Sequence, residues 1–433
     1  MKLNYKRTTL IGLAFASILC FWQFYDQVIP FILENTFGLR TTVANSFMSV
    51  DNILGVLLLP FFGALSDKTN TRLGKRTPYI LYGTLAAVAL MCVLAFLQKA
   101  QNFWGFIICL MVLLVVMSVY RSPAVSYMPD VTPKPLRSKG NAIINLVGYI
   151  GGIFATIVMM FMLKSETTDS GEKVYSSGQS FVPVFLIIAG FMLITVLIMV
   201  FSLNENKVLK QTNIQDEEEI NTNAGKKLPK DVFKSLVLIL LSVFLWWTAY
   251  NAVTTSFSRY CVNVWNVDLA TSSGYLTVAT IAAIAAFVPL GFLSSKLGRK
   301  KAVLAGILLM TVCYTAAIFI RQETPLMYAI FALVGIGWAS INVNSFPMAV
   351  EMCSGGDVGK YTGYYYTFSM AAQVVTPILS GLLIDNLGLG YNVLFPYAVV
   401  FSALSFVTMC FVRHGDSKPD SKTAIAEQFA AED

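Results

Sequence analysis

Apolar segments long enough to cross a bilayer recur along almost the whole chain, and a short polar or Gly/Pro-containing segment closes each of them. A membrane-spanning helix needs about 20 apolar residues. Segments of this length predict twelve helices, at residues 9–32, 43–65, 77–98, 103–128, 140–163, 181–203, 233–257, 270–293, 301–320, 325–348, 362–384 and 391–412. A transmembrane β-barrel would show segments of about ten residues with alternating polarity. The runs here are continuous, so the pattern predicts an all-α membrane protein.

Composition agrees with a protein that has lipid as its solvent. Of the 433 residues, 56% are hydrophobic and 13% are charged, whereas a soluble domain carries about 25% charged residues. The net charge of +7 could suggest a polyanionic partner, so the positions of Lys and Arg matter. Most of them fall at the two ends of the chain and in the loops after even-numbered spans. This asymmetry follows the positive-inside rule. It predicts cytoplasmic termini in a cell (inner or plasma) membrane and gives no reason to expect nucleic acid.

Neither a metal site nor an enzyme is indicated. The seven cysteines are scattered, mostly within spans and without CxxC spacing, so we expect no disulfide framework and no zinc site. The single histidine, His414, lies in the tail, which excludes a histidine proton relay. No nucleophile, base and orienting group converge at one depth. We expect no cofactor and no catalytic residue, with the lipid bilayer and a small solute as partners and a monomer as the working form.

The chain divides into two halves. Residues 204–232 are polar, mixed in charge and too long for a tight turn. We interpret them as a cytoplasmic linker between one six-helix bundle, residues 1–203, and a second, residues 233–412. Residues 413–433 have the composition of a disordered cytoplasmic tail. Many transporters consist of two repeats around a site at the middle of the membrane, so internal repetition is a test of function.

A polar motif is repeated in the two halves. The segment from Gly63 to Arg76 has the form G-x-x-x-D-x-x-x-x-R-x-G-[KR]-R, and a degenerate copy with Ser295 in place of the acid follows the eighth span. The first copy resembles the loop signature of the major facilitator superfamily, which implies two pseudo-symmetric six-helix bundles. The resemblance also implies a gating latch on the cytoplasmic side, formed by Gly63, Asp67, Arg72, Gly74, Arg76, Asp130, Arg137, Arg299 and Glu351. The competing interpretation is that these charges only set membrane topology.

Within that superfamily the chain resembles the glycoside-pentoside-hexuronide:cation symporters, and most closely their sucrose and sugar-proton branch. The residues that carry this resemblance are Ser66–Asp67, Arg72–Tyr79, Arg121–Ala124 and Pro129–Asn141. The resemblance implies cotransport of a sugar with a cation. The melibiose-type branch carries an acidic pair on helix 2 for sodium, but Gly55 and Leu59 occupy those positions here, and Asp51 lies a turn earlier. This departure favours H+ over Na+ as the coupling ion.

Three charged residues fall well inside predicted spans, away from their ends, where each costs roughly 2.5–3.5 kcal/mol to insert and by default marks a pathway or relay. They are Asp26, Asp51 and Arg121. Burial favours the neutral form of a carboxyl group, and a nearby arginine favours the charged form. A substrate that competes for Arg121 could therefore change the protonation of Asp26 or Asp51, which is a mechanism for proton symport. The competing interpretation is a fixed Asp–Arg pair that only holds helices together.

Amide and aromatic side chains within the spans are candidates for sugar binding, because hydroxyls need bidentate hydrogen-bond partners and C–H faces stack on rings. The candidates are Trp22, Gln23, Tyr25, Asp26, Tyr120, Arg121, Asn141, Asn145, Trp247, Tyr250, Asn251, Asn342, Asn344, Tyr365 and Gln373. A single aromatic residue is more often core or interface belt, whereas an unpaired amide in apolar surroundings costs several kcal/mol. The sequence predicts a di- or oligosaccharide:proton symporter that works by alternating access. A sodium-coupled symporter, a carrier of another metabolite or drug, and a sensor without transport stay as alternatives.

Overall fold

The computed structural model of the chain describes residues 3–39, 43, 47–163, 165–167, 173–175, 180–213, 228–267, 269–352, 357–386 and 390–416. Within these residues, twelve helices are long and apolar enough to span a membrane. The prediction of a twelve-span, all-α membrane protein is therefore confirmed. Much of the predicted linker and tail, namely residues 214–227 and 417–433, lies outside the described residues, and so does Cys353.

The first half contains six spanning helices and a short helix that follows them. Their bounds are α1 (Tyr5–Phe31) with its extension η1 (Ile32–Thr36), α3 (Val50–Asp67), α4 (Thr77–Lys99), α5 (Phe103–Asp130), η2 (Lys134–Leu136) leading into α6 (Arg137–Met162), α7 (Val182–Ser202) and the short α8 (Glu205–Asn213). Helices α1 and α5 each begin after an asparagine whose side chain accepts a hydrogen bond from the first turn, Asn4 from the N–H of Arg7 and Asn102 from the N–H of Gly105.

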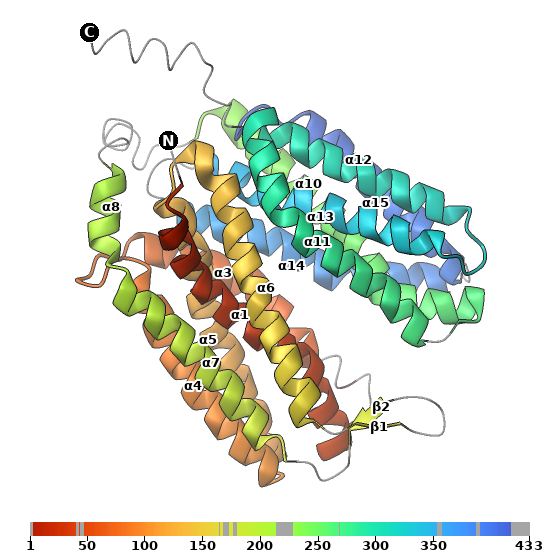
Figure 1. Cartoon of the computed structure of the whole chain (residues 1–433), viewed down its shortest axis with the longest axis horizontal. Coiled ribbons are helices and arrows are strands. Elements are labelled where there is room, and N and C mark those ends of the chain that lie inside the picture. The colour runs from red at the N-terminus through yellow and green to blue at the C-terminus, as the bar shows by residue number, and fades with distance from the viewer. Residues whose placement is uncertain are drawn as a thin grey trace.

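The second half repeats this arrangement. Its helices are α10 (Lys230–Tyr260) with η3 (Cys261–Trp265), α11 (Leu269–Leu297), α12 (Arg299–Ile318), α13 (Leu326–Glu351), α14 (Val358–Gly381) with η4 (Leu382–Asn386), and η5 (Tyr391–Val393) leading into α15 (Leu394–Cys410). Figure 1 shows the two bundles close together at the end where both termini lie and diverging away from that end. Contacts between the halves run mainly from α3 to α14 and from α6 to α11 and α13.

Two elements were not expected from the search for long apolar runs. A hairpin between α6 and α7 pairs β1 (Ser165–Thr167) with β2 (Lys173–Tyr175), with Ser165 opposite Tyr175. Strands of three residues are too short to show a periodic pattern. Helix α8, in turn, occupies the first part of the region that we interpreted as a linker.

The outer surface is that of a protein immersed in hydrocarbon. Large apolar side chains point outward around the molecule, among them Phe201, Phe161 and Trp104, which are 84%, 79% and 72% exposed. In water, apolar surface this extensive would mark an interaction site. In a bilayer it contacts lipid, and the spanning segments are helices, which pair most of their backbone polar groups internally.

Candidate functional site

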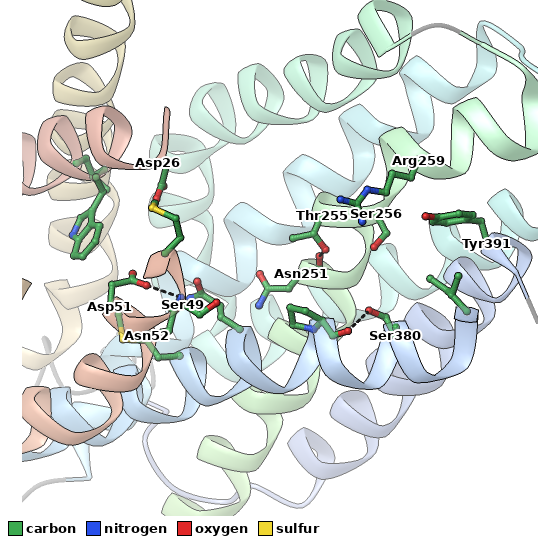
Figure 2. A pocket seen from close by; sticks show the side chains of 18 of the residues that line it. Asp26, Ser49, Asp51, Asn52, Asn251, Thr255, Ser256, Arg259, Ser380 and Tyr391 are labelled. Atoms are coloured by element: carbon green, nitrogen blue, oxygen red, sulfur yellow. Dashed lines mark hydrogen bonds between the residues drawn. The ribbon is translucent and has the colours of Figure 1, made fainter. Parts of the chain in front are cut away.

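A cavity of about 760 Å³ lies between the two halves, within the range of about 300–1,000 Å³ typical of small-molecule sites. Helices α1, α3 and α5 line it on one side, and α10 and α14 line it on the other. Most of the lining residues lie toward the helix ends that are remote from the N- and C-termini of the chain. Figure 2 shows Asp26 and Asp51 of the first half on one side, and Asn251, Thr255 and Arg259 of α10 across from them.

Both acids and the arginine singled out in the sequence line this cavity. Asp26 projects from α1, Asp51 from the first turn of α3 and Arg121 from the middle of α5. The Asp51 carboxylate accepts a hydrogen bond of 3.0 Å from the amide of Asn52. Three charged groups from three helices therefore converge on one space, although they are up to 95 residues apart in the chain.

Arg121 is held by aromatic rings. Its guanidinium carbon lies 5.2 Å from the ring centroid of Trp22 and 5.3 Å from that of Tyr366, within the distance at which a cation is attracted to a ring face. Among the described residues no acid lies within 4.0 Å of the guanidinium. The expected alternative of a fixed Asp–Arg pair is therefore not what the structure shows. Because Trp22 belongs to the first half and Tyr366 to the second, Arg121 touches both.

Six of the predicted binding and coupling residues line the cavity. They are Trp22, Asp26, Asp51, Arg121, Asn251 and Gln373. The indole N–H of Trp22 and the amide N–H groups of Asn251 have no hydrogen-bond partner among the described residues. A buried unpaired donor costs about 1–3 kcal/mol. Two such donors, one from each half, fit a cavity that takes a ligand rich in hydrogen-bond acceptors.

Two other predicted residues, Trp247 and Tyr250, belong to a row of aromatic rings that extends from α10 to the first half. Trp247 stacks on Trp246 with ring centroids 4.7 Å apart, and Tyr250 stacks on Trp338 at 5.5 Å. Tyr149 of the first half contacts Trp338 edge-on at 6.4 Å. Tyr250 also lines a smaller, mainly apolar cavity of about 200 Å³ inside the second half. These rings pack against one another and do not line the larger cavity.

The remaining predicted sugar-binding residues lie in helix contacts. The hydroxyl of Tyr120 is 3.3 Å from that of Ser17, and the hydroxyl of Tyr365 is 2.8 Å from that of Ser345. The Asn344 amide donates to a carbonyl of its own helix. Tyr25 is buried with its hydroxyl unpaired. Gln23, Asn141, Asn145 and Asn342 line neither of the two cavities.

At the end of the molecule near the chain termini, which we call the latch end, residues of the predicted latch make ion pairs and hydrogen bonds with one another. Asp67 makes an ion pair with Arg76, and the Nε of Arg76 donates to Asp130 at 2.8 Å. The Nζ of Lys75 lies 3.1 Å from Asp130. Asp67 also accepts hydrogen bonds from the backbone N–H groups of Gly359 and Lys360 in the other half. The first copy of the motif therefore ties the two halves together.

The second copy of the motif forms its own contacts. Arg299 makes an ion pair with Glu351, and its guanidinium donates to the carbonyl of Lys134 in the first half. The Nε of Arg137 donates to the carbonyl of Thr132 at 3.2 Å. Among the contacts of the described residues, Arg72 contributes its backbone carbonyl, which accepts from the amide of Asn206. The latch end is closed, and the cavity lies on the other side of it.

Two acids that sequence reasoning missed cap helix N-termini at the latch end. Glu205 accepts hydrogen bonds from the backbone N–H groups of Lys75, Arg76 and Thr77 at 2.8–3.1 Å. Asp416 accepts from the N–H of Arg299 at 2.7 Å. Each acid follows the last spanning helix of its half and caps the third spanning helix. The two caps therefore occupy equivalent positions in the two halves. An acid just beyond spans 6 and 12 was the available signal, but we interpreted these positions as linker and tail.

Glycines make the two caps possible. Gly74 and Gly298 adopt φ angles of +115° and +93° immediately before the capped turns, a region that other residues rarely enter. They turn the backbone so that consecutive N–H groups point at Glu205 and Asp416. Sequence reasoning also missed the polar cavity residues near helix ends, because the signal it used was a polar residue in the middle of an apolar span. These residues are Ser49, Thr255, Ser256, Arg259, Ser380 and Tyr391.

A cavity between two pseudo-symmetric six-helix bundles, closed at one end by contacts between the bundles, defines a membrane transporter. Residues 8–412 match the family model described as "MFS/sugar transport protein". The chain therefore belongs to this family of sugar-type transporters of the major facilitator superfamily.

Several known proteins are similar to it. The uncharacterized symporter YnaJ of Bacillus subtilis is 24% identical over 89% of this chain and 85% of its own. The isoprimeverose transporter of Lactiplantibacillus pentosus is 24% identical over 66% of this chain and 58% of its own. The alpha-ketoglutarate permease of Escherichia coli is 29% identical over 30% of this chain and 29% of its own, so the chain spans less than two thirds of the permease and of the isoprimeverose transporter.

Among solved structures, the transporter FucP in its outward conformation superposes with a TM-score of 0.74 at 15% identity, over 95% of this chain and all of FucP. At this identity the likeness shows the fold alone.

Proposed function

We propose that the protein is a sugar:proton symporter that works by alternating access in a cell membrane, with both termini in the cytoplasm. The observation that carries the proposal is the cavity that contains Asp26, Asp51 and an arginine with no acid partner among the described residues. With the latch end cytoplasmic, the conformation is outward-facing, since the cavity lies beyond the closed end. The substrate is a di- or oligosaccharide or another glycoside, and the working unit is a monomer.

The cavity offers the groups that a sugar needs. Arg121 presents N–H donors to the cavity while Trp22 and Tyr366 hold its cationic plane. Asn251 and Gln373 supply amides from the second half. Sugar oxygens accept from such donors, and the C–H face of the sugar stacks on an aromatic ring. A ligand that contacts both halves at once stabilises a conformation in which they approach each other.

Proton coupling follows from the arrangement of the acids. Asp26 and Asp51 lie on consecutive spans, α1 and α3, and face a shared space with Arg121. Arg121 favours the ionised carboxylates through its charge, and a sugar that draws its guanidinium away weakens that effect, which favours the protonated form of an acid. Release of sugar on the other side frees the arginine and favours release of the proton. Among the described residues, no group of three or more metal-ligating acids, histidines or cysteines is present.

Purified protein in liposomes with a pH-sensitive dye tests the proposal. Isoprimeverose, the substrate named for one relative, and a panel of disaccharides serve as probes. We expect addition of the transported sugar to alkalinise the side from which it is taken up, without a requirement for sodium. Asp26→Asn and Asp51→Asn should lose sugar-driven proton flux and keep sugar exchange, whereas Asp231→Asn, at an exposed position at the start of α10, should retain both.

Three results would contradict the proposal in different ways. Sugar uptake that requires sodium and leaves pH unchanged identifies sodium as the coupling ion. Uptake of a different metabolite, with no sugar moved, overturns the substrate class. Ligand binding without flux across the liposome membrane indicates a sensor.

A further inference from the structure

Prolines inside two spanning helices leave backbone carbonyls without their helical partners. Proline has no N–H, so the carbonyl four residues before it loses its hydrogen bond. Pro60 in α3 frees the carbonyl of Val56, and Pro347 in α13 frees the carbonyl of Val343. A carbonyl left unpaired in a dry interior is costly, so its partner in each conformation affects the conformational equilibrium.

Each of these two carbonyls accepts a hydrogen bond from the opposite half. The hydroxyl of Thr367 in α14 donates to the carbonyl of Val56 at 3.1 Å. The amide of Asn141 in α6 donates to the carbonyl of Val343 at 2.9 Å and also to that of Asn342 at 3.1 Å. The contacts are reciprocal. A side chain of the second half donates to a backbone carbonyl of the first half, and a side chain of the first half donates to a backbone carbonyl of the second.

Other contacts on α14 show that the Thr367 bond is specific. A threonine within a helix commonly donates to the carbonyl four residues earlier. Thr362 and Thr376 do so, donating to Val358 and Ala372 at 2.8 and 2.6 Å. Thr367 instead reaches across to α3.

Not every proline-freed carbonyl receives such a bond. Among the described residues, the carbonyls of Val119 and Gln373, freed by Pro123 and Pro377, accept no side-chain hydrogen bond. The two crossing bonds occur where α3 meets α14 and where α6 meets α13, which are contacts between the halves.

Both bonds lie between the cavity and the latch. On α3, Val56 lies after the cavity residue Asp51 and before the latch residue Asp67. Helices α3 and α14 are in close contact there, as shown by Gly363, where an added Cβ would collide with the backbone of Pro60. Asn141 follows Arg137 at the start of α6. If the halves separate at the latch end, as the proposed alternating access requires, both bonds must break.

We propose that Thr367–Val56 and Asn141–Val343 are reciprocal locks that hold the latch end closed, and that Pro60 and Pro347 create their acceptors. While the interface is dry, a side chain of the opposite half is the hydrogen-bond partner that the described residues offer each freed carbonyl. Once the halves separate, water enters and replaces the lost bond, so the lock stabilises the closed end without trapping the protein there. The inference rests on the proposed alternating access, and its test uses no substrate.

The test is a double-mutant cycle read by distances between spin labels, in a chain whose seven cysteines are replaced. Labels at Asn70 and Lys301, exposed residues at the latch end of the two halves, report opening there. We expect Thr367→Val to increase the ratio of open to closed latch end about two- to tenfold, from the loss of one net hydrogen bond. With Pro60→Ala, the restored N–H satisfies the Val56 carbonyl, so Thr367→Val should change the ratio less than about twofold.

A matched control and a second cycle keep the test decisive. Thr362→Val removes the same hydroxyl from the same helix but only an intrahelical bond, so it should leave the ratio unchanged. Asn141→Leu with and without Pro347→Ala is the cycle at the other lock, where Pro347→Ala should reduce the shift and leave the part that comes from the Asn342 carbonyl. This cycle serves alone if Pro60→Ala does not fold. An equal shift with and without the proline, an equal shift from Thr362→Val, or no shift at all overturns the proposal. Transport activity is measured separately, so a failure of sugar:proton coupling would not be mistaken for a failure of the locks.

Discussion

The carboxylate of Asp67, at the end of α3, caps the first turn of α14 in the other half, where it accepts a hydrogen bond of 2.8 Å from the N–H of Gly359. Helix α14 has an acid of its own at the N-cap position, Asp357, but that side chain makes no capping hydrogen bond. The N-terminus of a helix attracts negative charge. The halves are thus joined by a helix cap that comes from the opposite bundle.

The first prediction concerns this cap. Asp67→Asn removes the charge that faces both Arg76 and the N-terminus of α14, and it should shift the latch end toward the open state by about tenfold, since hydrogen bonds to charged groups contribute about 1.5–3 kcal/mol. Spin-label distances across the latch end measure this ratio. Asp357→Asn is the matched control and should leave it unchanged. A similar effect of both variants would show that net charge at this end matters and that the cap does not.

The second prediction concerns the close approach of α3 and α14. A Cβ on Gly359 would collide with the carbonyl of Gly63 and with the side chain of Arg76. Gly359→Ala should therefore prevent full closure of the latch end and reduce transport at least tenfold, while the protein still folds. Uptake into liposomes and the elution profile of the purified protein measure the two effects. Gly190→Ala on α7, where an added Cβ meets nothing within 4 Å, should transport normally.

The third prediction concerns the rings that hold Arg121. Tyr366→Leu removes a ring face, worth about 0.5–2 kcal/mol to a nearby cation, and should raise KM for the sugar several-fold. Tyr366→Phe keeps the ring and should stay close to the wild type. Arg121→Lys keeps the charge but loses the planar donor group, so we expect a larger increase in KM. Initial-rate uptake over a range of sugar concentrations measures all three. Equal defects in the Phe and Leu variants would assign the role to the Tyr366 hydroxyl.

The fourth prediction concerns stability. Glu205 is fully buried and accepts backbone hydrogen bonds from three consecutive residues, so Glu205→Gln should lower the free energy of unfolding by about 1–3 kcal/mol. Asp416→Asn should cost less, because among the described residues Asp416 accepts from two N–H groups, one of them at 3.4 Å. Thermal unfolding in detergent, followed by intrinsic fluorescence, ranks the variants. If Glu205→Gln unfolds at the wild-type temperature, the cap is dispensable.

The membrane spans could be predicted from sequence because the bilayer imposes a local rule. Hydrocarbon about 30 Å thick requires about 20 apolar residues in each spanning helix, and neighbours in the chain are sufficient to recognise such a run. Asp26, Asp51 and Arg121 were recognisable for the same reason, since a charge within an apolar run is costly wherever it lies. The first latch motif was recognised from its spacing, and its resemblance to a known loop signature implied a latch that includes Asp130 at the end of α5.

What the sequence could not determine is the direction in which each polar side chain faces. Asn141, Tyr120 and Tyr365 lie within spans like Asn251, yet the first three contact other helices and Asn251 faces the cavity. Spanning helices are apolar on most sides, so periodicity does not reveal the face toward the partner.

By itself, then, the sequence determined the number of spans, the internal repeat and the presence of charges within the membrane, because each depends on residues close together in the chain. Only the tertiary structure decided that Arg121 contacts the rings of Trp22 and Tyr366. It also decided that Glu205 and Asp416 are helix caps, and that Thr367 donates to a carbonyl 311 residues away. Those contacts depend on how helices rotate, bend at prolines and pack across the two halves, and no local pattern encodes them.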